Sequence, residues 1–418
     1  MYKDRKMKPT ITKIHLASFI VFMLFIYPPI FDKTSYLPAG NPIIMISVAF
    51  TLLRFAAMGV VLIYTCFIKK FMFSIKYLVP ILFFCMIYLI QIMSTIFHSG
   101  RVMHSIIVFF TMLIPIIWVV VNRMHYDEIV SALRVYMYCL IMANFVMILL
   151  FPNGYFVTVN MWKVADAQWL LGLGNTMSPY IILTIMLAIF SISEKKSWVS
   201  KIKDLVIVGI CVVTAFLVEC ATLIMGISIM LILVVFTRLI KNKKKNPINL
   251  LMIAAIVIVV AFVLLRNINL FAIIIEKFLK RDLTLTSRLR IWDSSIQSIL
   301  QKPLFGYGVC DFSYLQQVIL ASHQHNYYLH ILFQGGMASL IFFLLLLNCC
   351  RKELYKSTSR YSIIVAITIF TFLIIFISEV YGEGTYILPF YLVLTISLLQ
   401  KDEHELGEKN VFCNNAIL

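Results

Sequence analysis

Residues 103–121 read MHSIIVFFTMLIPIIWVVV, a run of nineteen residues without one charged side chain. A helix rises about 1.5 Å per residue, so a run of this length matches a hydrocarbon layer about 30 Å thick. The stretch therefore predicts a helix that crosses a lipid bilayer.

Apolar stretches of similar length occur on both sides of this one. Together they predict twelve spans, at 15–31, 43–67, 77–96, 103–121, 129–151, 169–192, 205–218, 222–237, 250–265, 328–350, 362–379 and 385–400. The stretch 205–240 is too long for one helix and is interrupted by ECAT at 219–222, which predicts two short helices joined by a tight turn. The first span lacks a small-residue cleavage site and is expected to be a retained signal-anchor.

The composition excludes most soluble classes of protein. Of the 418 residues, 61% are hydrophobic and 13% are charged, and the mean hydropathy is +0.95. Soluble chains have about 45–50% apolar and about 25% charged residues, so a soluble enzyme, a disulfide scaffold, a coiled coil and a disordered chain are all excluded. The expected fold class is all-α, a polytopic integral membrane protein with about twelve transmembrane helices.

The formal net charge of +17 does not indicate a nucleic-acid partner. The basic residues lie in short runs between apolar spans, whereas a nucleic-acid site needs them gathered on one folded face. Segments predicted to be cytoplasmic hold 24 Lys and Arg residues, and the five short outer connections hold Lys33, Arg101 and Lys163. This contrast predicts that both termini are cytoplasmic and that membrane lipids are partners.

One long outer loop, at 266–327, separates helices 9 and 10. It divides the chain into a membrane bundle at 1–265, the loop, three more helices at 328–400 and a cytoplasmic tail at 401–418. Within the loop, TSRLRIWDSSIQSILQK at 286–302 predicts a helix capped by Thr286 or Ser287, with an apolar stripe at Leu289, Trp292, Ile296 and Ile299. Pro303, Gly306 and Gly308 then predict a turn.

Any chemistry is expected on the outer side, because the sequence has no P-loop, GxSxG or HExxH motif. Cys220 and Cys310 both fall on that side, where a disulfide between them is a minor alternative. In SHQHNYYLHILFQGG, at 322–336, Asn326, His330 and Gln334 recur every four residues and predict a buried polar stripe. The simpler alternative for His323 and His325 is that they are loop histidines, and no third ligand at useful spacing supports a metal site.

Arg288 lies four residues before Trp292, beside the apolar stripe, whereas Arg290 falls on the side of Asp293 and Gln297. Arg288 is therefore predicted to point inward and Arg290 to be solvated. A guanidinium over a membrane-surface cavity suits a diphosphate, because its planar fork donates two parallel hydrogen bonds. A structural salt bridge is the alternative.

These segments carry a family resemblance. TSRLRIW, KPLFGYGVCDF and SHQHNYYLHILFQGG, in this order, resemble the signature of the O-antigen ligase and polysaccharide polymerase (Wzy and WaaL) superfamily over residues 286–340. WLLGLGNTMSPY at 169–180 is similar to a Gly-Asn segment that opens a middle helix in that family. The resemblance implies glycan transfer from an undecaprenyl-diphosphate carrier at the outer face of the bacterial inner membrane, without a cofactor or a metal.

The resemblance also implies roles for single residues. Arg288 would hold the donor diphosphate, and His325 would act on the acceptor hydroxyl as general base or orienter. Two departures from the family pattern matter. Cys220, Ala221 and Thr222 stand where members often have Ser-Arg, so one anion contact is either missing or supplied by Arg266 or Arg54. Gln334 also replaces a common Glu. Glu379 or Glu383 is the rival base, and the residues expected to line the site are Asn326, His323, His330, Gln334 and Trp292.

The predicted function is that of a polymerase of surface polysaccharide, such as O-antigen, capsule or exopolysaccharide. Its substrate would be an undecaprenyl-diphosphate-linked oligosaccharide, and other assembly proteins, such as a flippase or a chain-length regulator, are expected partners. Two alternatives remain: an O-antigen ligase whose acceptor is lipid A core, and a flippase or other transporter. A flippase should lack a long ordered outer loop and carry charges deep in the bundle.

Overall fold

The computed structural model describes residues 12–69, 74–159, 165–194, 197–239, 246–264, 285–357, 359–381 and 386–399. Most of these residues are helical. The first half contains α1 (Lys13–Phe25), the 3-10 helix η1 (Pro29–Tyr36), α2 (Pro42–Ile63) with the π-helical η2 (Tyr64–Ile68), α3 (Ile75–Phe97), α4 (Val102–Val121), η3 (Arg123–His125) and α5 (Tyr126–Leu150).

The second half begins with a short hairpin. It contains β1 (Phe156–Val159), β2 (Ala165–Gln168), η4 (Asn175–Met177), α6 (Ser178–Ser193), α7 (Trp198–Leu217), α8 (Ala221–Leu239), α9 (Ile248–Val259), η5 (Val260–Leu264), α11 (Leu285–Gln301), α12 (Phe312–Ile319), α13 (Tyr327–Lys356), α14 (Arg360–Ile375) and α15 (Leu388–Leu398). The antiparallel strands pair Phe156 with Gln168 and Val159 with Ala165.

The all-α polytopic class expected from the sequence is confirmed, with the hairpin as an addition. Each of the twelve expected spans coincides with a helix, from α1 to α9 and from α13 to α15. Seven helical segments of the described chain are long and apolar enough to cross a membrane, and four further apolar helices are shorter. The split near residue 219 is confirmed, because α7 ends at Leu217, Glu219 has a φ of 48° and α8 begins at Ala221.

Two helix starts differ from the sequence expectation. The sixth helix begins at Ser178 and not near residue 169, because Trp169 and Gly172 exchange backbone hydrogen bonds in a tight turn before η4. The loop helix begins at Leu285, so the backbone of Thr286 and Ser287 belongs to its first turn.

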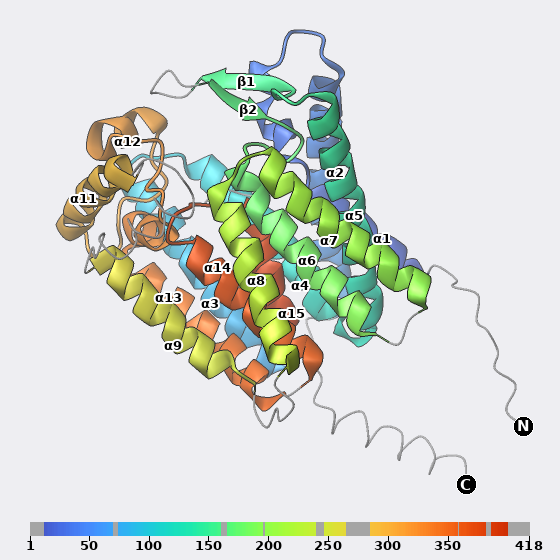
Figure 1. Cartoon of the computed structure of the whole chain (residues 1–418). Helices are drawn as coiled ribbons and strands as arrows, with labels where there is room; N and C mark the ends of the chain where they lie inside the picture. Colours follow the sequence, from blue (N-terminus) through green and yellow to red (C-terminus); the bar gives the residue numbers. More distant parts are fainter. Residues whose placement is uncertain are drawn as a thin grey trace, which may run out of the picture.

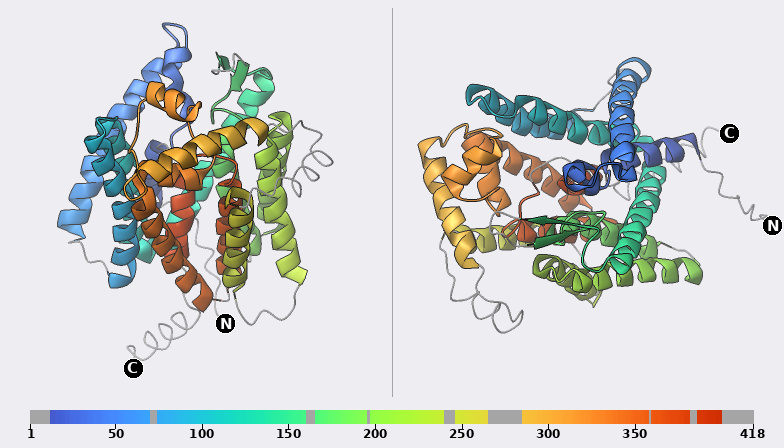
Figure 2. Two further views of the ribbon diagram at one scale, coloured as in Figure 1. Left: turned by 90° about the vertical axis from the view of Figure 1, so that its left-hand side faces the viewer. Right: turned by 90° about the horizontal axis from the view of Figure 1, so that it is seen from above.

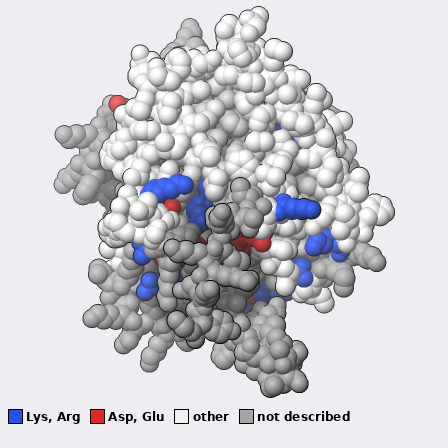
Figure 3. All heavy atoms as spheres, turned by 90° about the vertical axis from the view of Figure 1, so that its right-hand side faces the viewer, with Lys and Arg blue, Asp and Glu red and all other residues white. Residues whose placement is uncertain are grey.

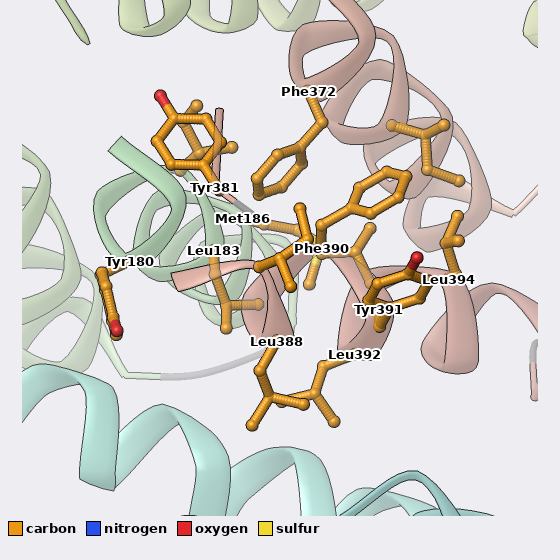
Figure 4. Close-up of a cluster of buried hydrophobic side chains, with 14 of the residues drawn as sticks. Tyr180, Leu183, Met186, Phe372, Tyr381, Leu388, Phe390, Tyr391, Leu392 and Leu394 are labelled. Carbon is orange, nitrogen blue, oxygen red and sulfur yellow. The ribbon is translucent and has the colours of Figure 1, made fainter. Parts of the chain in front are cut away.

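The core lies between α6, α14 and α15, which are buried over almost their whole length. Figure 4 shows part of this core, where side chains of α6, α14 and α15 pack together; the rings of Phe372 and Phe390 lie 5.2 Å apart. Helix α2, in contrast, leaves Met45, Leu52 and Val60 exposed. Apolar side chains that face outward in this way suit a lipid environment.

Helices α11 and α12 lie at one end of the bundle, and α11 crosses the helix ends instead of running along them (Figures 1 and 2). At the opposite end, Lys76 at the start of α3 forms an ion pair of 2.9 Å with Glu353 near the end of α13. Figure 3 shows that the Lys and Arg residues on one face gather in its middle and lower part, below a nearly uncharged surface. We call the end that carries α11 the outer end.

Candidate functional site

The segment after α14 is the centre of the polar site. Three consecutive backbone carbonyls accept hydrogen bonds from motif residues: Phe376 from the Tyr327 amide at 2.8 Å, Ile377 from Asn326 Nδ2 at 2.9 Å, and Ser378 from Arg288 Nη1 at 2.7 Å. Helix α11, the start of α13 and the end of α14 therefore meet at one point. The structure thus brings together Arg288, Asn326 and Glu379, which lie far apart in the sequence.

Glu379 is the buried acceptor in this site. Its side chain is 3% exposed and accepts three hydrogen bonds, from Arg288 Nη2 at 3.1 Å, Asn175 Nδ2 at 2.8 Å and Thr222 Oγ1 at 3.2 Å. A carboxylate that accepts several charge-assisted and neutral hydrogen bonds is fixed in orientation. This arrangement favours a positioning role for Glu379, and its role as a base stays a prediction.

Asn175 and Thr222 are site residues that the sequence did not single out. Asn175 belongs to the Gly-Asn segment at 172–175, and Thr222 lies one residue after the start of α8. The sequence signal for Asn175 was its place in the Gly-Asn segment that resembles the family, whereas Thr222 lies in a segment that departs from the family pattern. Their partner Glu379 lies more than 150 residues further along the chain, so no local pattern could have indicated the contact.

Arg288 is partly open to a ligand. Its side chain is 28% exposed, whereas that of its partner Glu379 is almost completely buried. Arg290 is exposed on the opposite side of α11, as predicted, and Leu289, Trp292, Ile296 and Ile299 pack toward the core. The structural salt bridge that was the alternative role for Arg288 is present. It engages only part of the guanidinium, which has five N–H donors.

His325 lies next to this ion pair in a strained backbone conformation. Its φ is 49°, its amide donates to His323 Nδ1 at 3.2 Å, and the two imidazole rings are 4.0 Å apart. Burial, and then the positive charge of Arg288, lower the pKa of His325 to about 4. His325 Nδ1 is buried and has no hydrogen-bond partner within the part of the chain that the structure describes. His325 is therefore neutral near pH 7 and has a ring nitrogen unused by these residues.

The predicted polar stripe on α13 is buried, but its three residues contact different parts of the structure. Asn326 caps α13 by accepting from the Leu329 amide at 3.0 Å while it binds Ile377. His330 Nδ1 is 2.7 Å from Gln324 Oε1. Gln334 lines a separate hollow with Gln91 and other residues of α3 and α4. Only Asn326 belongs directly to the group around Arg288.

The glycines of the motif shape the backbone. Residues 303–308 pack against a break in α13 at Gly336, where the amides of Met337 and Ala338 donate to the carbonyls of Pro303 and Leu304 at 2.8 and 3.1 Å. A Cβ at Gly336 would lie 2.3 Å from Leu304, and one at Gly308 would lie 2.3 Å from the Thr95 amide nitrogen. The predicted turn is confirmed, and it anchors the outer segment to α13 and α3.

Two other buried groups border the site. Trp292 is 3% exposed, and its Nε1 has no hydrogen-bond partner among the described residues. Tyr381, also buried, lies near enough to Glu379 and Arg288 for their charges to act on its hydroxyl, and burial raises its pKa well above the usual value. Figure 4 shows Tyr381 beside the core of α6 and α15.

Arg54 belongs to another group. It is buried in α2, and its guanidinium lies 4.4 Å from the centre of the Tyr27 ring, whose hydroxyl donates to Asp32. Arg266 and Glu383 lie outside the described residues.

Neither a disulfide nor a metal cluster is seen in the described parts. Within these residues, neither Cys220 nor Cys310 forms a disulfide. The same residues contain no group of three or more His, Cys, Asp or Glu side chains placed to hold a metal ion.

Fold and site together define a polytopic helical membrane protein with a partly buried arginine–carboxylate–histidine group at one end of its bundle. A family model described as O-antigen ligase matches residues 205–344, from α7 to the first half of α13. This match confirms that the chain resembles the O-antigen ligase and polysaccharide polymerase superfamily, and it includes Arg288, Trp292 and His325 but neither Glu379 nor Arg54. No curated protein matches the chain.

Proposed function

We propose that this protein is a membrane glycosyltransferase that polymerises a bacterial surface polysaccharide. It would transfer the glycan of an undecaprenyl-diphosphate-linked donor to the terminal sugar of another lipid-linked repeat unit. The reaction would take place at the outer face of the inner membrane, with both termini in the cytoplasm. The observation that carries the proposal is the partly exposed Arg288 beside the neutral His325, within the segment that matches the family.

Arg288 suits the departure of the lipid diphosphate. When the bond between the anomeric carbon and the diphosphate oxygen breaks, negative charge grows on the leaving group. A guanidinium already oriented by Glu379 and the Ser378 carbonyl can stabilise that charge without first reorganising. Glu379 would act in this scheme as a positioning residue, because it sets the plane of the Arg288 fork.

His325 suits the acceptor side of the reaction. The acceptor hydroxyl would attack the anomeric carbon and give its proton to the neutral imidazole, which would later release it to water. A pKa of about 4 makes a weak base, but the charge of Arg288 contributes to this low value. A bound diphosphate would offset that charge, so the pKa of His325 should rise when the donor binds, toward the range in which a general base is effective.

The ligase alternative has a specific observation in its favour, since the matching family model is described as O-antigen ligase. A ligase would use the same Arg288 and His325, with a lipid A core as acceptor. The flippase alternative has less support, because part of the outer segment forms the ordered helices α11 and α12.

The test is to incubate purified protein in lipid nanodiscs with lipid-linked repeat units, with or without lipid A core. A ladder of polymers made from repeat units alone is expected. A single transfer that needs lipid A core would establish the ligase, and no transfer by wild-type protein in either mixture would overturn the proposal. Arg288→Ala should remove the product, whereas Arg290→Ala is the matched control from the same helix.

A further inference from the structure

The outer segment exposes three large apolar side chains where α11 ends. Leu300, in the last turn of α11, is 71% exposed, and Leu304 and Phe305, in the turn that follows, are 64% and 61% exposed. We call these three residues the apolar rim. Single exposed apolar residues are common on protein surfaces, but several so close together indicate an interaction site. The surroundings of the apolar rim indicate which kind of partner it contacts.

Hydrogen bonds fix the apolar rim at the outer ends of two long helices. The Ala338 amide of α13 donates to the Leu304 carbonyl at 3.1 Å. From the last turn of α3, Ser94 Oγ donates to the carbonyl of Gly306, the residue after Phe305, at 2.9 Å. The turn that carries Leu304 and Phe305 is therefore attached both to α13 and to α3.

Helices α3 and α13 have apolar faces that lead toward the apolar rim. The two helices contact each other where Ser339 Oγ donates to the Ile87 carbonyl at 3.2 Å, and both are long and apolar enough to cross a membrane. Exposed apolar side chains recur on them at helical spacing, at Leu82, Met86, Leu89, Met93 and Ile96 of α3 and at Met337, Ile341 and Leu344 of α13. Such faces suit contact with the hydrocarbon chains of a bilayer. The apolar rim continues these two lipid-facing surfaces.

The length of α3 sets the depth of the apolar rim. Its 23 residues span about 34 Å, slightly more than a hydrocarbon layer of about 30 Å. At the opposite end of α3 lies Lys76, whose ion pair with Glu353 suits the headgroup region and not the hydrocarbon. The last turn of α3, to which the rim is attached, therefore falls at the boundary between acyl chains and headgroups.

Lys302 lies between the residues of the apolar rim and suits the same boundary. Its ammonium group is 4.5 Å from the centre of the Tyr307 ring, which stacks on Phe333 with ring centres 5.0 Å apart. A lysine can keep its charged end among lipid phosphates while its stem lies along apolar surface. Basic and aromatic residues beside exposed apolar ones are typical of elements that lie in the membrane interface. This combination favours lipid over a second protein as the partner.

We propose that the apolar rim inserts into the leaflet at the outer end of the bundle. Leu300, Leu304 and Phe305 lie among the upper parts of the acyl chains, and Lys302 lies at the level of the phosphates. The partner of this surface is phospholipid, so the outer segment is a membrane-anchored element and not a loop in water.

The anchor has a consequence for Arg288, and this consequence rests on the proposed function. Helix α11 crosses the helix ends, so its first turn, with Arg288, and its last turn lie over the same end of the bundle (Figures 1 and 2). A lipid-linked donor keeps its prenyl chain in the hydrocarbon and its diphosphate among the headgroups. By holding α11 at this depth, the apolar rim places Arg288 near the level of the donor diphosphate. Its members are positioning residues.

Electron paramagnetic resonance can measure the depth of the apolar rim. Phe305→Cys, on a background without the native cysteines, is labelled with a nitroxide in nanodiscs of phosphatidylethanolamine and phosphatidylglycerol. The label should collide severalfold more with O₂ relative to a water-soluble nickel chelate than a label on Gln317→Cys. Gln317 is the matched control, because it is an exposed polar residue of α12, which lies farther from the bundle than α11 (Figures 1 and 2). Leu89→Cys gives the value for a lipid-facing position.

Equal collision ratios at positions 305 and 317 would place the apolar rim in water and overturn the proposal. A label protected from both reagents would mean that protein covers the rim, which also overturns it. If the cysteine-free protein does not accumulate, photoreactive benzoylphenylalanine in place of Phe305 in the otherwise native chain should crosslink to phospholipid. A crosslink to protein alone, or none, has the same meaning as a protected label.

Kinetics of glycan transfer in nanodiscs test the link to Arg288. Phe305→Ser should raise KM for the lipid-linked donor severalfold, and Phe305→Trp should stay near wild type, because tryptophan favours the membrane interface. Gln317→Ser is the control and should leave KM unchanged. An unchanged KM in Phe305→Ser would overturn the positioning role. Wild-type protein without transferase activity would overturn the proposed function, whereas the spin labels would still decide whether the apolar rim contacts lipid.

Discussion

In the proposed function, Arg288 would combine a structural and a chemical role in one side chain. Its contacts with Ser378 and Glu379 hold α11 to the segment after α14, and the exposed part of its side chain would contact the donor diphosphate. The two roles predict different results, because loss of the first lowers the yield of folded protein and loss of the second lowers turnover.

We expect Arg288→Lys to be clearly impaired, because lysine keeps the charge but loses the fork. Arg288→Ala should be worse by about 1.5–3 kcal/mol, as for a hydrogen bond to a charged group. The measurement is polymer made per correctly inserted molecule, with Arg290→Ala expected near wild type. Normal turnover of the Arg288→Ala molecules that do insert would remove Arg288 from the reaction.

Of the two neighbouring histidines, His325 should matter more. It carries the unused Nδ1 and adjoins Asn326, whereas His323 accepts a hydrogen bond from the His325 amide. His325→Ala should lower the rate about 10²- to 10⁴-fold, as for removal of a general base, and His323→Ala should be milder. A larger loss of rate in His323→Ala than in His325→Ala would mean that His323 is the base. Near-normal rates in both variants would leave Glu379 or Glu383 as the candidate base.

The low pKa of His325 predicts an unusual pH profile. Because this group loses its proton at about pH 4 and is active when neutral, kcat/KM should stay level from pH 8 to about pH 5 and fall only below that. The profile of kcat should fall at a higher pH, since the bound diphosphate offsets Arg288 in the complex. A fall of kcat/KM centred near pH 6.5 in wild type, absent from His325→Gln, would show an imidazole with an ordinary pKa.

At the scale of elements, the helices and turns could be predicted from the local sequence, but the contacts between them could not. The periodicity of α11 indicated its apolar stripe, and Gly306 and Gly308 indicated a turn. Nothing local revealed that this turn packs into a break at Gly336, because that contact depends on α3 and α13 lying side by side. For the same reason the sequence suggested Arg288 and Glu379 separately but not as a pair.

The close fit at Gly308 should make it intolerant of a side chain. Alanine there would place Cβ 2.3 Å from the Thr95 amide nitrogen at a φ of +74°, so the turn must shift. Gly308→Ala should therefore lower the thermal unfolding temperature and the amount of inserted protein. Gly209→Ala is the matched control, because no atom lies within 4 Å of its Cβ and alanine favours the helix α7. Equal stability of both variants would contradict the close contact.

At the scale of the whole molecule, composition and span lengths were enough for the class of fold. Each expected span contains a helix, since a bilayer demands long apolar runs that are visible in sequence. The hairpin β1–β2 was not foreseen, because two four-residue strands outside the apolar spans leave little signal. Orientation is a separate matter: it depends on the distribution of Lys and Arg between the loops, and it decides which compartment the site faces.

The orientation can be tested by labelling single cysteines in intact cells, on a background without the native cysteines. Cysteine at Lys302, beside the end of α11, should react with a membrane-impermeant maleimide before permeabilisation, because the outer end is predicted to face away from the cytoplasm. Cysteine at Lys356, at the end of α13, is the control from the opposite end and should react only afterwards. The reverse pattern would place Arg288 and His325 in the cytoplasm, where a reaction on externally displayed glycan is impossible, and the proposed function would fall with the topology.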